Sequence, residues 1–170
     1  LAKESLSLLG ANILTVCENG SDQQARSQML LGSMLAGMAF SNAPVAAVHA
    51  LAYPLGGHFH VPHGLSNSLV LPHVMRFNIP AAKEAYAELA SLLFPDIEPS
   101  SAETMATDLA SRLAQLADDL GLETRLRDVG VSQNQIPMLA EDAMKQARLL
   151  VNNPREMTYA AALEIYQQAH

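Results

Sequence analysis

The sequence has one cysteine, few charged residues and no apolar segment long enough to be a membrane span. Cys17 is the only cysteine among 170 residues, which excludes an internal disulfide framework and fits a reducing compartment. The apolar segment 29–40 (MLLGSMLAGMAF) is too short to cross a bilayer, so it predicts a buried core helix. We therefore expect a cytoplasmic protein that has no membrane partner.

Basic clusters and targeting signals are also absent. The chain carries 10 Lys and Arg against 17 Asp and Glu, and no basic stripe is interleaved with aromatic residues, so we expect no nucleic-acid partner. No basic segment leads into a short apolar run with a cleavage site, which argues against a secretory signal. The chain begins at Leu1, without Met and inside a helix-like pattern, and we interpret it as a piece of a longer polypeptide.

A two-residue apolar period is missing throughout, so no β-sheet is expected. Apolar residues recur instead at helical spacing in successive segments, as they do at Leu6, Leu9, Ile13 and Val16. With 49% apolar residues, the chain can bury the core of one domain spanning residues 1–170. The predicted fold class is all-α, a bundle of about seven or eight helices.

Helix boundaries are predicted from caps, glycines and prolines. Thr158 caps the last helix, and three capping boxes open earlier ones: Ser21 with Gln24, Ser100 with Glu103, and Ser132 with Gln135.

Around the middle of the chain, a helix from Pro44 is expected to end near Leu55 because Gly56 follows. A loop at 56–62 leads to a helix at 64–77, which tolerates or kinks at Pro72. A separate helix is expected at 81–94, and a single turn at 124–129.

Residues 49–78 hold five of the six histidines: His49, His58, His60, His63 and His73. His49 lies within one predicted helix, and His63 begins the next, fourteen residues later. A chain that folds back between them could point both imidazoles at one metal ion, and imidazole suits zinc, iron and nickel. The seven-residue loop reaches up to roughly 23 Å, so a shared ion is permitted but not required. Two histidines hydrogen-bonded inside a helix pair are the alternative.

The remaining candidates have simpler interpretations. His58 and His60 form an H-x-H pair that we interpret as part of a solvated loop, and His73 as a packing or capping residue. Tyr53 lies one helical turn after His49 on the same face, where its hydroxyl could hydrogen-bond an oxygen bound at a metal. A core tyrosine with its hydroxyl at the rim is the alternative, and the side chain of Phe40 is expected in the core.

Two segments are similar to a known family. Residues 37–78 (GMAFSNAPVAAVHALAYPLGGHFHVPHGLSNSLVLPHVMRFN) resemble the signature region of the iron-containing (group III) alcohol dehydrogenases. The NPRE segment at 153–156, with a short helix after it, resembles that family's C-terminal end. In the family, a nucleotide-binding α/β domain precedes an all-helical domain of the dehydroquinate synthase-like fold. This chain resembles the helical, metal-binding domain alone.

The resemblance assigns roles to five residues. The family binds iron, and sometimes zinc, through one aspartate and three histidines, and two of these histidines match His49 and His63. The other two ligands form a D-x-x-x-H motif that is absent here, so they are expected before residue 1. Phe40 and Leu149 match positions that line the substrate pocket. Tyr53 matches a position beside the nicotinamide and the substrate, which implies a catalytic and cofactor-binding role.

The implied activity is metal-dependent hydride transfer between an alcohol or aldehyde and NAD or NADP. This chain would supply half of the metal site and one wall of the substrate pocket, and alone it is expected to be inactive. A homo-oligomer is also compatible with the resemblance. One alternative is a related glycerol dehydrogenase or maleylacetate reductase type of enzyme. The other is a stand-alone helical metal-binding or interaction module without catalysis.

Overall fold

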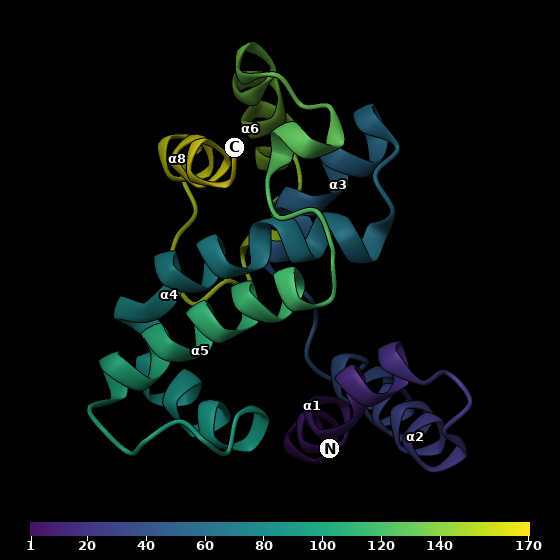
Figure 1. Cartoon of the computed structure of the whole chain (residues 1–170). Coiled ribbons are helices and arrows are strands. Elements are labelled where there is room, and N and C mark those ends of the chain that lie inside the picture. The colour runs from purple at the N-terminus through teal and green to yellow at the C-terminus, as the bar shows by residue number, and fades with distance from the viewer. The chain divides into compact units, whose positions relative to one another are not determined.

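The structure, a computed structural model, describes all 170 residues and contains helices but no strand (Figure 1), as predicted. The chain folds into two compact units: residues 1–44 with 83–109, and residues 45–82 with 110–170. The elements are α1 (Ala2–Glu18), α2 (Gln23–Phe40), α3 (Ala47–Phe59), α4 (His63–Leu93), α5 (Ala102–Asp119), the short 3-10 helices η1 (Leu126–Val129) and η2 (Gln133–Gln135), α6 (Ile136–Met144), α7 (Ala147–Leu150) and α8 (Tyr159–Ala169).

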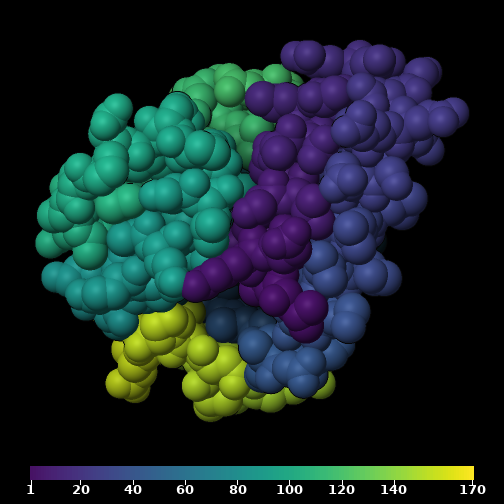
Figure 2. All heavy atoms as spheres, turned by 90° about the horizontal axis from the view of Figure 1, so that it is seen from below, coloured from purple at the N-terminus to yellow at the C-terminus, as the bar shows by residue number.

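In the first unit, α1 and α2 lie side by side, as Figure 2 also shows for the purple and violet segments. The buried Ser5 hydroxyl donates a hydrogen bond to the carbonyl oxygen of Gly32 at 2.7 Å. A Cβ added at Gly32 would stand only 2.9 Å from Cγ of Leu9. The two helices therefore approach closely because this position has no side chain.

The prediction that α2 is a buried core helix is wrong. Only Ala25 and Gly32 of this helix are buried, whereas Leu30 is 73% exposed and Met34 is 55% exposed. Within this unit α1 covers one face of α2. The apolar residues of α2 continue onto a second face that no element of the unit covers. The predicted cap also shifts by one residue, because Asp22 rather than Ser21 accepts the hydrogen bond from the Ala25 amide at 2.9 Å.

The core of the second unit joins α3, the first part of α4, α6 and α8. In Figure 2 the yellow C-terminal segment lies against the blue segment that contains α3. The Tyr166 hydroxyl donates a hydrogen bond to the carbonyl oxygen of Leu51 at 2.6 Å, and both residues are fully buried. Burial also raises the pKa of Tyr166, so the hydroxyl stays protonated as the donor.

Two helix boundaries around the histidine-rich stretch differ from the prediction. The helix expected to end at Leu55 continues through Gly56 to Phe59, and the helices expected at 64–77 and 81–94 form one helix of 31 residues. Glycine and proline lower helix propensity, but packing overrides this preference when neighbouring residues are buried. Around Pro80, where the break was expected, the buried neighbours are Asn78, Ile79 and Ala82.

Several other local predictions hold. The Ser132–Gln135 capping box is present, Thr158 caps α8 through the Ala161 amide, and one 3-10 turn occurs at Leu126–Val129. The α5 cap is one residue later than predicted, because Ser101 Oγ accepts from the Thr104 amide at 3.1 Å. None of the helices combines the length and the apolar character needed to cross a membrane.

The buried hydrogen bond of Tyr166 generates a stability prediction. Replacing Tyr166 with Phe removes the donor to Leu51 and should lower the free energy of unfolding by about 1 kcal/mol. Tyr159→Phe is the matched control, because Tyr159 lies on the same helix and is 41% exposed. Urea denaturation of both variants measures the difference, and equal midpoints would contradict the importance of this bond.

Candidate metal centre

The candidate centre is built where α3 turns back into α4. His49 and Tyr53 lie four residues apart on one face of α3, and His63 is the first residue of α4. The ring centroids of His49 and His63 are 5.2 Å apart, with a tilt of 55° between the ring planes. The Tyr53 ring centroid lies 6.2 Å from that of His63. The fold thus brings together three of the residues selected from the sequence.

The turn between the helices depends on His60. It adopts the left-handed conformation with φ 55° and ψ 25°, and its amide donates to the carbonyl oxygen of Gly56 at 3.1 Å. Ser66, which is buried, then anchors the start of α4 by donating to the carbonyl oxygens of Val61 and Pro62. These bonds fix the backbone next to His63.

The electrostatic environment keeps the His49 imidazole suited to a metal. Burial lowers the pKa of His49, and the neighbouring His63 lowers it further. Neutral imidazole is the form with a free lone pair, so this shift favours the form that binds metals.

Asn67 orients the ring of His63. Its side-chain amide nitrogen donates to the backbone carbonyl oxygen of His63 at 2.8 Å and lies 3.2 Å from the ring atom Nε2. The carbonyl contact identifies the amide nitrogen as the group that faces the ring, so Nε2 accepts with its lone pair, and a metal bound at Nε2 would displace this contact. The other amide atom, Oδ1 of Asn67, is buried beside the centre without a hydrogen-bond partner.

These residues fit one side of a divalent metal site. His49 and His63 offer two converging imidazoles, a donor set that suits iron and zinc, and the orphaned Oδ1 of Asn67 marks a polar environment around them. No cluster of three or more histidine, cysteine or acidic side chains completes the site within this chain. Two imidazoles amount to half of the four donors of a typical zinc site.

The other histidines lie apart from this pair. His58 was expected in a solvated loop, but it belongs to the last turn of α3, and its Nε2 lies 2.5 Å from Oδ2 of Asp142. Hydrogen bonds from Lys145 and His58 lower the pKa of Asp142. His60 is exposed and ends α3. His73 is half-buried on α4, and burial and the charge of Arg76 lower its pKa.

The two residues matched to the substrate pocket have different surroundings. Phe40 is the last residue of α2 in the first unit, and its side chain is 60% exposed rather than in the core as expected. Leu149 lies on α7 in the second unit, where it is 7% exposed and belongs to the core cluster. Helix α7 packs against α3, which carries His49 and Tyr53.

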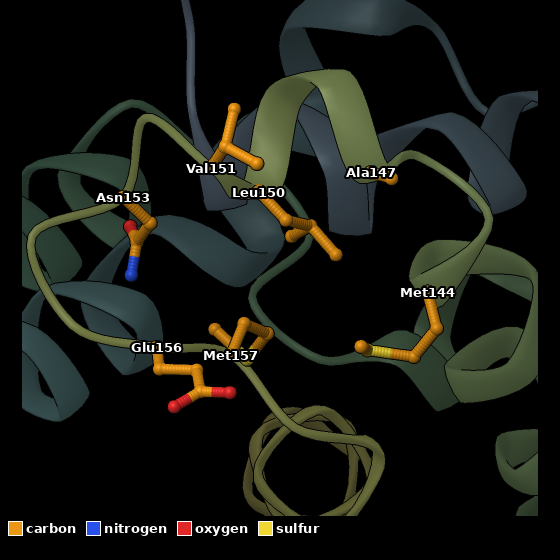
Figure 3. Close-up of a pocket in the computed structure, with 7 residues that line it drawn as sticks. All are labelled: Met144, Ala147, Leu150, Val151, Asn153, Glu156 and Met157. Atoms are coloured by element: carbon orange, nitrogen blue, oxygen red, sulfur yellow. The ribbon is translucent and has the colours of Figure 1, made fainter.

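A hollow of about 480 Å³ beside α7 was not expected from the sequence (Figure 3). Leu150, Met144 and Met157 point toward one another across it, and Glu156 contributes a carboxylate at its side. Its remaining lining residues are Ala147, Val151 and Asn153. Asn153 and Glu156 of the NPRE segment line the hollow, and this segment was the only sequence signal near it. The apolar lining residues come from three separate segments, so no single stretch of sequence predicts the hollow.

The comparisons with known proteins cover the whole chain. The family described as "Fe-containing alcohol dehydrogenase family, C-terminal" matches residues 1–170. The 1,3-propanediol dehydrogenase of Klebsiella pneumoniae is 37% identical over 168 residues, which are 99% of this chain and 43% of that protein. Lactaldehyde reductase of Escherichia coli (strain K12) is 38% identical over 148 residues, which are 87% of this chain and 38% of that protein.

Solved structures give the same result. A crystal structure of 1,3-propanediol oxidoreductase superposes with a TM-score of 0.93 at 36% identity and covers 99% of this chain and 44% of that one. The chain thus spans less than half the length of the relatives it matches. From its first residue to its last, the chain belongs to the iron-containing alcohol dehydrogenase family and corresponds to the family's C-terminal helical domain.

Proposed function

We propose that this chain is the helical part of a metal-dependent alcohol dehydrogenase, in which His49 and His63 hold a divalent metal, iron or zinc. One observation carries the proposal: two imidazoles fourteen residues apart lie with ring centroids 5.2 Å apart, with Tyr53 next to them, in a chain that matches the family throughout. In this proposal the remaining ligands and the site for NAD or NADP lie in a nucleotide-binding domain that precedes this chain.

In the proposed reaction, hydride passes between an alcohol or aldehyde carbon and the nicotinamide. The metal, when bound, supplies Lewis-acid stabilisation of charge on the substrate oxygen. Burial favours the neutral form of His49, and His49 and His63 would hold the ion through their imidazoles. Asn67 lies against the His63 ring and bonds the His63 backbone carbonyl oxygen. Tyr53 is 37% exposed beside His63, so its hydroxyl can reach a substrate oxygen and donate a hydrogen bond there.

We also propose Phe40 and Leu149 as substrate-contacting residues, each considered within its own unit. Phe40 offers an exposed aromatic surface, which suits contact with an alkyl chain. Leu149 is buried, so it would shape the pocket from behind by setting the position of α7 against α3. The relatives act on different small molecules according to their names, and the identity of this protein's alcohol depends on such pocket residues.

The metal assignment is tested by removing each ligand. In the full-length protein, His49→Ala and His63→Ala should each weaken metal affinity by more than ~100-fold, beyond the usual effect of losing an outer-shell partner, and should abolish alcohol oxidation. Metal content by elemental analysis and activity are the measurements. His58→Ala is the matched control, and it should retain the metal. Metal retention in either ligand variant would refute the assignment, and bound metal without alcohol oxidation in the native protein would favour the non-catalytic module.

The role of Tyr53 is tested by removing only its hydroxyl. Tyr53→Phe should lower kcat by roughly 100-fold, the lower range for a positioned proton donor, while metal content stays unchanged. Tyr53→His restores a donor and should recover part of the rate. An unchanged kcat in Tyr53→Phe would show that the ring acts through packing alone.

The pocket role of Phe40 is tested through substrate preference. Phe40→Ala should shift the ratio of kcat/KM between a long and a short primary alcohol by about 10-fold, because a few methylene contacts are worth that much discrimination. Met38→Ala is the control, since Met38 is 49% exposed on the same helix. Equal ratios in the native protein and Phe40→Ala would remove Phe40 from the pocket.

A further inference from the structure

A second concave site lies in the second unit, between α4 and α8. Three residues of α4, His73, Arg76 and Phe77, follow at helical spacing, and Glu164 and Gln168 face them from α8. Together with Arg155 they line a cleft of about 530 Å³, which we name the α4–α8 cleft. The small side chains of Ala160 and Ala161 form part of its wall and leave room for a ligand.

Arg155 is held in a fixed position within this cleft. Its Nη1 donates to the carbonyl oxygen of Phe77 at 2.9 Å, and its guanidinium carbon lies 4.2 Å above the centre of the Phe77 ring. The backbone is fixed too, because the side chain of Asn153 donates to the Arg155 carbonyl oxygen at 2.7 Å. A guanidinium has five N–H donors, and the contact with Phe77 uses only one side, so donors remain for a ligand.

The charge balance of the cleft favours an anion. Arg76 adds a second guanidinium, and no ion pair is formed by its side chain in the structure. Glu164 is the single acidic residue of the lining, and its carboxylate accepts a hydrogen bond from Gln168 at 3.1 Å. Because His73 is largely neutral, the lining carries two positive charges and one negative charge.

Arg76 has room to reorient, whereas Arg155 does not. Arg76 also borders a smaller hollow of about 120 Å³, which Glu123 helps to line. An exposed arginine between the two hollows can turn toward an anion in the larger one, and Arg155 provides the preorganised partner.

We propose that the α4–α8 cleft binds a small oxyanion, with Arg155 and Arg76 as its guanidinium ligands. Paired guanidiniums recognise the two oxygens of a phosphate or carboxylate through parallel hydrogen bonds, which fits either a phosphate monoester or a dicarboxylate. The site is separate from the proposed metal centre, whose residues do not line it.

The test uses inorganic phosphate and malonate as probes on the full-length protein, with chloride at equal ionic strength as the reference. Isothermal titration calorimetry gives the affinity, and the ring signals of His73 in NMR spectra report whether the probe enters this cleft. Arg76→Gln should weaken phosphate binding about 10-fold, since a charge-assisted hydrogen bond is worth roughly that factor. Arg127→Gln is the control: it removes an exposed charge outside the cleft and should leave phosphate binding unchanged.

The outcomes distinguish the possible ligands and refute the proposal if it is wrong. A stronger response to phosphate than to malonate supports a phosphate monoester, and the reverse supports a dicarboxylate. Binding that is no tighter than that of chloride, equal affinity in Arg76→Gln and the native protein, or an unmoved His73 signal would each overturn the site. Arg155→Lys retains the charge, so reduced affinity in a folded Arg155→Lys protein would show that the fixed fork geometry matters. Alcohol oxidation is not a readout here, so this test and that of the proposed function fail independently.

Discussion

The reversal of the chain at His60 is the constraint on which the candidate metal centre depends. His60 is the only non-glycine residue with positive φ, a conformation that costs an L-residue roughly 1–2 kcal/mol. The hydrogen bond from its amide to Gly56 and the anchoring bonds of Ser66 hold it there. Because this turn sets where α4 begins, it also sets the distance between the imidazoles of His49 and His63.

Contacts from the C-terminal end of the chain support that arrangement. The Tyr166 hydroxyl binds the backbone of α3 at Leu51, and Asn78 and Asn153 exchange reciprocal amide hydrogen bonds at 3.0 and 2.8 Å. The side chain of Asn152 also donates to the carbonyl oxygen of Val45 at 3.1 Å, just before α3. Residues far apart in sequence therefore hold the two helices of the candidate centre and the segment that carries Arg155.

Helix α4 separates two chemical environments along its length. Its first residue, His63, faces a second histidine whose burial favours the neutral form. Nearly four turns later, at about 3.6 residues per turn, Arg76 and Phe77 face α8 and Arg155 across a cleft with excess positive charge. Because a helix is a rigid element, each site keeps its own geometry while both are tied to the same core.

Local pattern was sufficient for the helical class and for several caps. Thr158 and the Ser132–Gln135 pair act next to their own helices, so their hydrogen bonds need no distant partner. The family resemblance also depends on local sequence, because residues 37–78 and 153–156 are recognisable without knowledge of the fold. His49 and His63 were also selected from this local sequence, but their spacing did not decide whether the two imidazoles meet.

Tertiary structure decided what local pattern could not. Helix breaks were expected at Gly56 and before residue 81, yet both helices continue. Burial of neighbouring side chains outweighs the low helix propensity of glycine and the backbone hydrogen bond lost at proline. The apolar second half of α2 predicted burial, but a helix is covered only where another element meets it. The sequence by itself determined the all-helical class and which chemistry the residues carry. Only the fold decided that His49 meets His63 and that Arg155 meets Phe77, because both contacts depend on where distant backbone segments are held.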